Sequence, residues 1–226
     1  MQTVMDRPTT SPGLEQALRL HLQQVERLRF QLHSLRGAIV ATIAALMEAH
    51  DAHTSAHCEA VTDCAVMVAR ELGLPSGEVE AVRLASLLHD VGKIAVADAV
   101  LQKPGPLDKD EWEAMRQHPV TAERLLEGLP LPPETIAAVR HHHERYDGRG
   151  YPDGLSADEI PIGARIVAVA DAFHAMTSDR PYRSRVPIDQ ARAEIKRCAR
   201  SHFCPKVVEA FLRVSARPEF ERAFAA

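Results

Sequence analysis

A chain of 226 residues is long enough for one globular domain with an additional arm. Its content of 46% apolar and 26% charged residues is typical of a globular protein, and we find no run of about 18 apolar residues that predicts a membrane span. The net charge of −4 argues against a protein that coats nucleic acid, because bulk binding of that kind needs a broad basic face.

Residues 1–12 are rich in Thr, Ser and Pro, and we expect them to be disordered. This segment lacks the basic stretch followed by an apolar stretch that marks a secretory signal, so we expect a cytoplasmic protein. The cysteines form no CxxC pair, and isolated cysteines in a cytosolic chain are usually reduced and inert. We therefore expect no function for Cys58, Cys64, Cys198 or Cys204.

Residues 13–40 predict a long N-terminal helix that continues to about residue 49. Apolar residues recur at heptad spacing, in one unbroken series and a second that His21 and Thr42 interrupt: Leu18, Val25, Leu32, Ile39 and Leu46, then Leu14, Leu28 and Leu35. Such a stripe is typical of a seam between two helices, which predicts a homodimer. The alternative is a helix that packs on its own domain. That alternative gains support beyond Leu35, because the domain must begin near Gly37.

The rest of the chain predicts helices separated by Pro and Gly. We expect them near 54–73, 78–90, 108–128, 132–143, 163–178, 187–200 and 205–214. Asp108 followed by Glu111 predicts a capping box at the start of one of them. Alternating β patterns are almost absent, so the predicted fold class is all-α, with one domain over 41–216 and a C-terminal tail over 217–226.

Polar side chains interrupt several of the apolar helical segments. They are His57, the pair His89 and Asp90, His118, the pair His142 and His143, and Asp171. Burying an ionisable group costs several kcal/mol unless it is paired or bound to a metal ion. Imidazoles and carboxylates without thiolates indicate Fe, Mn, Zn or a similar divalent ion, and seven ligands exceed the needs of one tetrahedral site. The pattern therefore predicts a centre with two metal ions.

Each of these residues alone has a simpler interpretation. A single His57 or His118 is more often a hydrogen-bonded core histidine, and Asp171 alone could stand at a helix end. The adjacent pairs are harder to explain in this way, because neighbouring side chains on a helix diverge by about 100° and can face one centre only near the end of an element. Glycines do follow both pairs, at Gly92 and in the segment DGRGYPDG.

Several motifs in order along the chain resemble one known family. They are His89 and Asp90 with Lys93, the run HHERYDGRGYP at 142–152, and ADAFHAMTSDRPYR at 170–183, with KPG at 103–105 and the dipeptide HP at His118. Together they closely resemble the HD-GYP phosphodiesterases, a branch of the HD superfamily of metal-dependent phosphohydrolases, over about residues 40–215. The resemblance implies an HD-domain helical bundle that binds two or three metal ions. It also implies hydrolysis of cyclic di-GMP to pGpG, and often on to GMP.

The same resemblance implies a role for each matching residue. The metal ligands would be His57, His89, Asp90, His118, His142, His143 and Asp171, with Asp90 bridging two ions. Members with three metal ions carry a glutamate where this chain has His53. His53 lies one helical turn before His57, so it is either the ligand of a third ion or a hydrogen-bonding histidine.

Substrate and catalytic roles follow in the same way. Two cations can neutralise phosphate oxygens and lower the pKa of a water, and Lys93 beside Asp90 would stabilise charge that develops in the reaction. The resemblance assigns Arg180 and Arg183 to the phosphates or guanines of the ligand. The glycines of the loop would hold Tyr151 at the substrate pocket, with Lys103 as a further contact. The simpler interpretation of these cations is a role in surface solubility.

Three further positions concern the surroundings of the ligands. His141 is expected on the exposed face of its helix. Thr121 replaces the glycine that is usual after the HP dipeptide, and His174 stands where aspartate is common. Neither replacement removes a ligand.

The sequence therefore predicts a cyclic di-GMP phosphodiesterase that uses two divalent ions, such as Fe or Mn, with a third as the alternative. Its predicted partners are cyclic di-GMP, a second copy of the chain and signalling proteins, without bulk nucleic acid or membrane. One rival is a non-catalytic receptor for cyclic dinucleotides, whose mark would be lost ligands. Another is an HD hydrolase that acts on a different phosphoester such as cyclic GMP-AMP.

Overall fold

The computed structural model describes residues 12–50, 54–179 and 185–224. Its described residues form helices, and the β pairing among them is an isolated bridge between Ala199 and Phe203. The predicted all-α class is confirmed. The chain divides into two compact units, Met1–Ile39 and Val40–Ala226. The predicted disorder of residues 1–12 lies almost wholly outside the described residues.

The first unit holds most of the long helix α1 (Pro12–His50). Several large apolar side chains of this part are exposed, and five of them belong to the heptad series: Leu14, Leu18, Leu28, Leu32 and Leu35, beside Leu20, Leu22 and Phe30. Val25 and Ile39 of the same series are half-buried. Among the described residues of its own unit, nothing covers this apolar face. Whether a second copy covers it stays a prediction.

Helix α1 meets the length and hydropathy criteria for a membrane span, although no continuous apolar run was found in the sequence. Within Gly13–Met47 it is long enough to cross a bilayer, and an 18-residue window of it reaches a mean hydropathy of 1.3 with 11% of that window buried. This finding rests on length and composition alone. Core helices of soluble proteins and signal sequences meet the same criteria, so it is weak evidence for a membrane segment.

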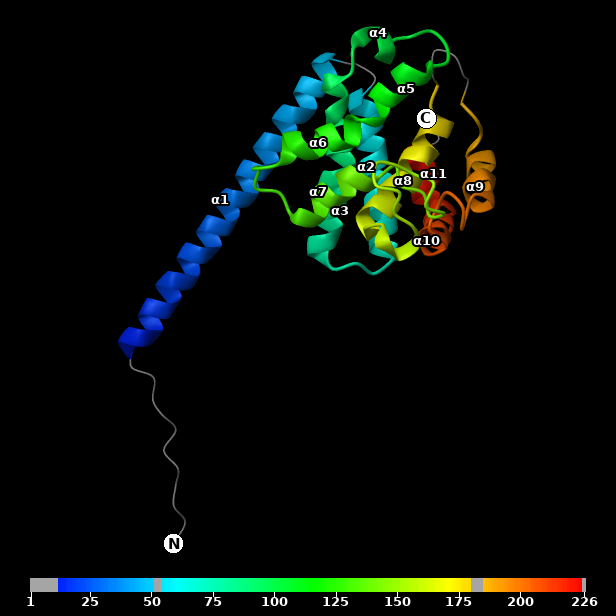
Figure 1. Cartoon of the computed structure of the whole chain (residues 1–226). Helices are drawn as coiled ribbons and strands as arrows, with labels where there is room; N and C mark the ends of the chain where they lie inside the picture. Colours follow the sequence, from blue (N-terminus) through cyan, green and yellow to red (C-terminus); the bar gives the residue numbers. More distant parts are fainter. Residues whose placement is uncertain (1–11, 51–53, 180–184, 225–226) are drawn as a thin grey trace. The chain divides into compact units, whose positions relative to one another are not determined.

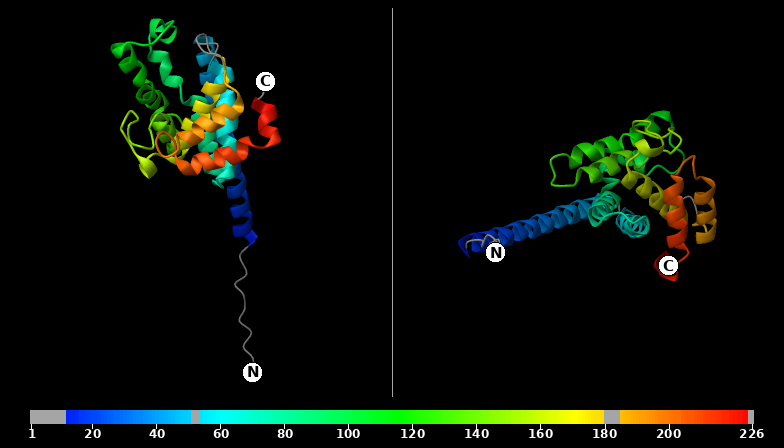
Figure 2. Two further views of the ribbon diagram at one scale, coloured as in Figure 1. Left: turned by 90° about the vertical axis from the view of Figure 1, so that its right-hand side faces the viewer. Right: turned by 90° about the horizontal axis from the view of Figure 1, so that it is seen from below.

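The second unit is a bundle of short helices built around α8 (Ile162–Thr177). In Figures 1 and 2, α8 lies between α6 and α7 on one side and α9 and α10 on the other. The elements besides α8 are α2 (Thr54–Glu71), α3 (Ser76–Leu88), η1 (Val91–Ala95), α4 (Asp98–Leu101), α5 (Lys109–Arg116), α6 (His118–Leu126), α7 (Pro133–His141), η2 (Ala157–Glu159), α9 (Ile188–Arg197), α10 (Pro205–Ser215) and α11 (Pro218–Phe224).

Two groups of buried apolar side chains hold this bundle together. The first joins α8, α10 and α11, where the ring of Phe173 lies 5.2 Å from that of Phe211 and 5.4 Å from that of Phe220, measured between centroids. The second packs α3 against α6 and α7 through Leu88, Leu126 and Val139. The apolar face of α8 contributes to both groups. This helix is therefore fixed from two sides, which holds Asp171 in place.

The helices differ from the sequence expectation in two places. The helix expected over 108–128 is interrupted at Gln117, so α5 ends at Arg116 and α6 begins at His118. Pro119 in the first turn of α6 explains the break, because proline has no backbone N–H to donate to the preceding turn. The capping box of Asp108 and Glu111 is confirmed. The segment expected to be a tail contains α11, and its Phe220 is fully buried.

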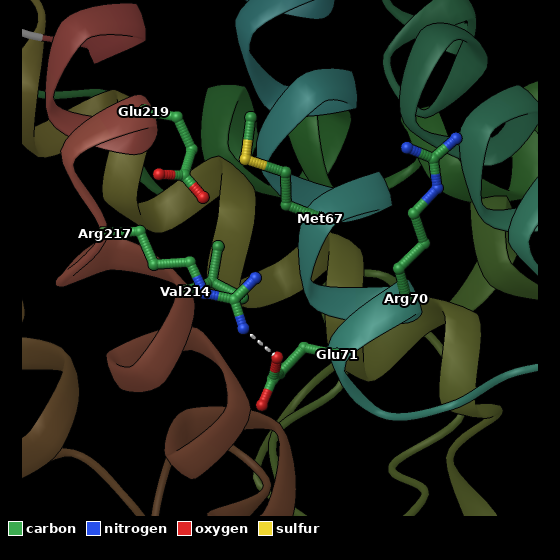
Figure 3. A pocket seen from close by; sticks show the side chains of 6 residues that line it. All are labelled: Met67, Arg70, Glu71, Val214, Arg217 and Glu219. Carbon is green, nitrogen blue, oxygen red and sulfur yellow. Dashed lines mark hydrogen bonds and ion pairs between the residues drawn. The ribbon is translucent and has the colours of Figure 1, made fainter.

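A surface hollow of about 310 Å³ lies beside the C-terminal helices, and Figure 3 shows the side chains that line it. Its lining residues are Met67, Arg70, Glu71, Val214, Arg217 and Glu219. Glu71 accepts hydrogen bonds from Arg213 and Arg217, which ties the end of α2 to α10 and to the start of α11. None of the lining residues is a predicted site residue, and the ion pairs indicate a structural role.

Candidate metal centre

All seven predicted ligands lie in one cluster, and most of them stand at helix ends. His57 is in the first turn of α2, His89 and Asp90 follow α3, and Asp171 belongs to α8. His118 begins α6, and His142 and His143 follow α7. Neighbouring histidine rings in the cluster have centroids between 4.0 and 5.5 Å apart.

Backbone hydrogen bonds fix the orientation of three of these rings. The Nδ1–H of His89 donates to the carbonyl of Ser86 at 2.7 Å. His118 and His142 make the same bond to the carbonyl three residues earlier, at 2.8 and 2.6 Å. A carbonyl oxygen can only accept, so the proton of each neutral ring is on Nδ1. The Nε2 lone pair of each ring is then free to bind a cation.

The ligand atoms form two groups, and Asp90 has one oxygen near each. One group is His57, His89 and Asp90, and the other is His118, His142 and His143; within each, the atoms lie within 4.8 Å of one another. Asp90 Oδ2 is 3.4 Å from His89 Nε2, and Asp90 Oδ1 is 3.5 Å from His118 Nε2. This arrangement suits a carboxylate that bridges two ions.

Asp171 reaches the cluster from α8. Its Oδ1 atom lies 3.3 Å from His57 Nε2, and its side chain is 23% exposed. On its other side, the His57 ring faces His174, with the two Nδ1 atoms 2.7 Å apart. This second contact could not be predicted from the sequence, which shows only that a histidine stands at position 174 where aspartate is common.

Burial keeps three of the imidazoles neutral. It lowers the pKa of His118 to about 4 and that of His143 to about 3, and it holds the pKa of His142 well below its usual range. Burial would raise the pKa of the Asp90 carboxyl, but the nearby Lys93 ammonium and histidines outweigh it and hold that pKa well below its usual value. At neutral pH these three imidazoles are thus neutral and the Asp90 carboxylate is charged.

These donors fit a divalent metal ion. His89 Nε2 is buried without a hydrogen-bond partner in the described part of the chain. The lone pair of this nitrogen faces an oxygen of the Asp90 carboxylate. In the other group, the Nε2 atoms of His118 and His142 face each other at 3.4 Å. Such contacts are repulsive unless a cation lies among them. Nitrogen and oxygen donors without sulfur suit Fe, Mn or Zn.

Lys93 lies at the edge of the cluster. Its Nζ atom donates to Asp90 Oδ2 at 2.6 Å, and its side chain is 38% exposed. The 3-10 helix η1 brings it there, three residues after Asp90. Lys93 therefore lies beside Asp90, as predicted, and its ammonium group can also contact solvent.

The loop after His143 places Tyr151 over the cluster. The ring of Tyr151 stacks on that of His143, with centroids 4.9 Å apart and planes 26° apart. The guanidinium of Arg116 lies over the ring of Tyr151, 4.8 Å from its centroid. Sequence reasoning missed Arg116, because no spacing rule relates α5 to this loop.

A buried glutamate and a glycine hold this loop in shape. Glu144 Oε1 accepts hydrogen bonds from the backbone N–H of Asp153 and Gly154 at 2.7 and 2.9 Å. A Cβ atom on Gly150 would lie 2.3 Å from the backbone nitrogen of Arg145, so only glycine fits at that position. Both residues keep the loop folded back on the end of α7, where Tyr151 belongs.

The remaining predicted site residues have different outcomes. His53, Arg180 and Arg183 lie outside the described residues. Lys103 donates to Glu111 and is 3.9 Å from Asp108, so its partners in the described structure are at the start of α5 and not among the metal ligands. His141 was expected to be exposed, but its side chain is 14% exposed because its Nε2 lies 2.8 Å from Asp153 Oδ2.

Several known proteins are similar to this chain. The family model described as HD domain matches residues 41–207. Over 211 residues the chain is 43% identical to the cyclic di-GMP phosphodiesterase response regulator RpfG of Xanthomonas campestris pv. campestris, covering 92% of this chain and 53% of that protein. Over 171 residues it is 42% identical to a cyclic di-GMP phosphodiesterase of Thermotoga maritima, covering 75% of this chain and 46% of that one.

A solved structure extends the likeness. It is a cyclic GMP-AMP specific phosphodiesterase of Vibrio cholerae, which superposes with a TM-score of 0.52 and 32% identity over 80% of this chain and 41% of that one. The chain spans about half the length of the curated relatives it matches.

Proposed function

The chain belongs to the HD-domain family, with the motifs of its HD-GYP branch, and we propose that it hydrolyses cyclic di-GMP to pGpG with the help of divalent metal ions. The observation that carries this proposal is the complete set of seven ligands, in two groups that share Asp90. We propose two ions, Fe or Mn. A third ion at His53 remains the alternative.

The residues of the site have different roles in the proposed reaction. Bound ions would supply positive charge that shields phosphate oxygens and makes water more acidic. The neutral imidazoles and the two aspartates hold these ions. Lys93 is both paired with Asp90 and partly exposed, so its ammonium can donate to a phosphate oxygen as charge develops there. Tyr151 covers one side of the cluster and limits the access of water.

The direct test is hydrolysis by purified protein loaded with Mn or Fe. We expect chromatography to show loss of cyclic di-GMP and formation of pGpG, and the same traces reveal whether cleavage continues to GMP. Cyclic GMP-AMP is assayed in parallel, since one structural relative is specific for it. No turnover of either compound under both metals would refute the proposal. Tight binding without turnover would instead indicate a receptor.

Arg116 is expected to bind a phosphate of the substrate. Its guanidinium stands over Tyr151, and Arg116 has no ion pair among the described residues. One charge-assisted hydrogen bond is worth about 1.5 kcal/mol or more, so Arg116→Ala should raise KM about tenfold with a smaller change in kcat. Steady-state kinetics measures both values. The matched control is Arg124→Ala on the exposed side of α6, and equal kinetics of the two variants would contradict this role.

We also propose that α1 pairs with α1 of a second copy. Its apolar series has the heptad spacing of a two-helix seam, and Leu28 and Leu32 on it are 56% and 41% exposed. Replacing both by lysine should raise the dimer dissociation constant at least about a hundredfold, because each buried leucine contributes about 1.5–3 kcal/mol. Analytical ultracentrifugation measures this. Gln23→Lys, on the opposite face of the helix, is the control.

A wild-type monomer at micromolar concentration would contradict the paired helix. Fractionation of the cell lysate tests the proposed cytoplasmic location. Recovery of the protein in the membrane fraction would favour the bilayer as the surroundings of α1. A partner protein that signals through α1 or the loop at Tyr151 remains part of this proposal, and capture by a dimeric but not by a monomeric variant would support it.

A further inference from the structure

His57 differs from the other histidines of the cluster in how its second nitrogen is held. In His89, His118 and His142 the Nδ1–H donates to a backbone carbonyl three residues earlier. His57 lies in the first turn of α2. Its Nδ1 atom faces a side chain from another helix, that of His174.

The rings of His57 and His174 are in close contact. The two Nδ1 atoms are 2.7 Å apart, and the ring centroids are 4.8 Å apart with planes tilted by 57°. His174 lies on α8, nearly one turn after Asp171, whose Oδ1 is 3.3 Å from the opposite nitrogen of His57. Helix α8 therefore contacts both nitrogens of one imidazole.

The positions of the protons follow from this arrangement. For His57 Nε2 to bind a cation it must carry no proton, so the proton of the neutral ring is on Nδ1. That N–H then donates to His174 Nδ1, which must accept. The proton of His174 is then on Nε2, which lies 3.0 Å from Ser178 Oγ and can donate to it. One consistent chain of hydrogen bonds thus runs from His57 through His174 to Ser178.

We propose that His174 is a positioning residue that holds His57 in the orientation and tautomer in which Nε2 binds a metal ion. Partners of this kind make a ligand more basic and fix its ring. The inference rests on the proposed metal-dependent function. Its test reads metal binding rather than hydrolysis, so the two can fail separately.

The test compares three variants by their affinity for Mn²⁺, measured by competition with a fluorescent chelator. His174→Leu removes the acceptor and should weaken binding about 10- to 100-fold. His174→Asn keeps an acceptor oxygen near the position of Nδ1 and should remain within about threefold of the wild type. Thr177→Val is the matched control, because it removes a hydrogen bond to the carbonyl of Phe173 on the same helix without touching a ligand.

Each outcome decides the proposal. Unchanged affinity in His174→Leu overturns it, as does a loss in His174→Asn as large as that in His174→Leu. An equal loss in Thr177→Val would show that the packing of α8 matters and not the hydrogen bond. Thermal unfolding of the metal-free variants shows whether each is folded.

A second measurement holds even if His174→Leu does not fold. Long-range ¹H–¹⁵N spectra of the wild type loaded with diamagnetic Zn²⁺ report which nitrogen of each ring is protonated. We expect Nδ1–H in His57 and Nε2–H in His174. A His174 ring protonated at Nδ1 in the loaded protein would overturn the proposal. Failure to hydrolyse cyclic di-GMP, with these results intact, would refute only the proposed substrate.

Discussion

Replacing Asp90 with asparagine is expected to lower kcat about a thousandfold, because bound ions supply several kcal/mol of transition-state stabilisation and each 1.36 kcal/mol is a factor of ten. The two oxygens of this carboxylate lie 3.4 Å from His89 Nε2 and 3.5 Å from His118 Nε2, one in each ligand group. Asparagine keeps the shape but replaces one oxygen by an amide that cannot bind a cation. One group would thus lose its shared ligand.

Metal analysis by mass spectrometry should show fewer ions per chain in Asp90→Asn than in the wild type. Asp63→Asn is the matched control, since Asp63 is an exposed aspartate on α2, the helix that carries His57. We expect this control to keep the activity and the metal content of the wild type. An Asp90→Asn variant with full activity would mean that the chemistry does not depend on the cluster.

The positions of the ligands could be predicted from sequence because each one breaks a local rule. His89 and His118 are polar residues in apolar surroundings, and a buried imidazole needs a partner. The motifs around these residues also resemble those of one family, and that resemblance implies that the ligands share one site. The convergence of His57 and Asp171, which are far apart in the chain, was predicted in this way, and the structure brings them within 3.3 Å.

Other contacts could not be predicted, because they depend on how helices pack and not on local spacing. His174 lies 117 residues from His57, and its ring meets His57 only because α8 crosses the start of α2. Arg116 reaches Tyr151 in the same way, from α5 to a loop. The α11 helix was missed since its short sequence has little periodicity. It is held chiefly by the burial of Phe220.

The sequence drew attention to Gly92 only as a possible turn, but the structure gives it a stricter role. Here η1 approaches α6 so closely that the hydrogen of Gly92 faces the backbone of the other element. An added Cβ atom would lie 1.9 Å from the carbonyl oxygen of His118 and 2.6 Å from the nitrogen of Ala122. Both are backbone atoms, so no side-chain rotation can relieve the clash. The approach also sets the distance between Asp90 and His118.

Gly92→Ala is therefore expected to destabilise the fold by about 3 kcal/mol or more, because overpacking against backbone must displace a whole element. For a domain of this size the loss corresponds to a fall in Tm of roughly 6–12 °C. Any shift of η1 also separates Asp90 from His118, so the folded fraction should bind less metal. Gly77→Ala is the control, since no atom lies within 4 Å of a Cβ there. A Gly92→Ala variant with the Tm and metal content of the wild type would show that η1 and α6 are farther apart than described.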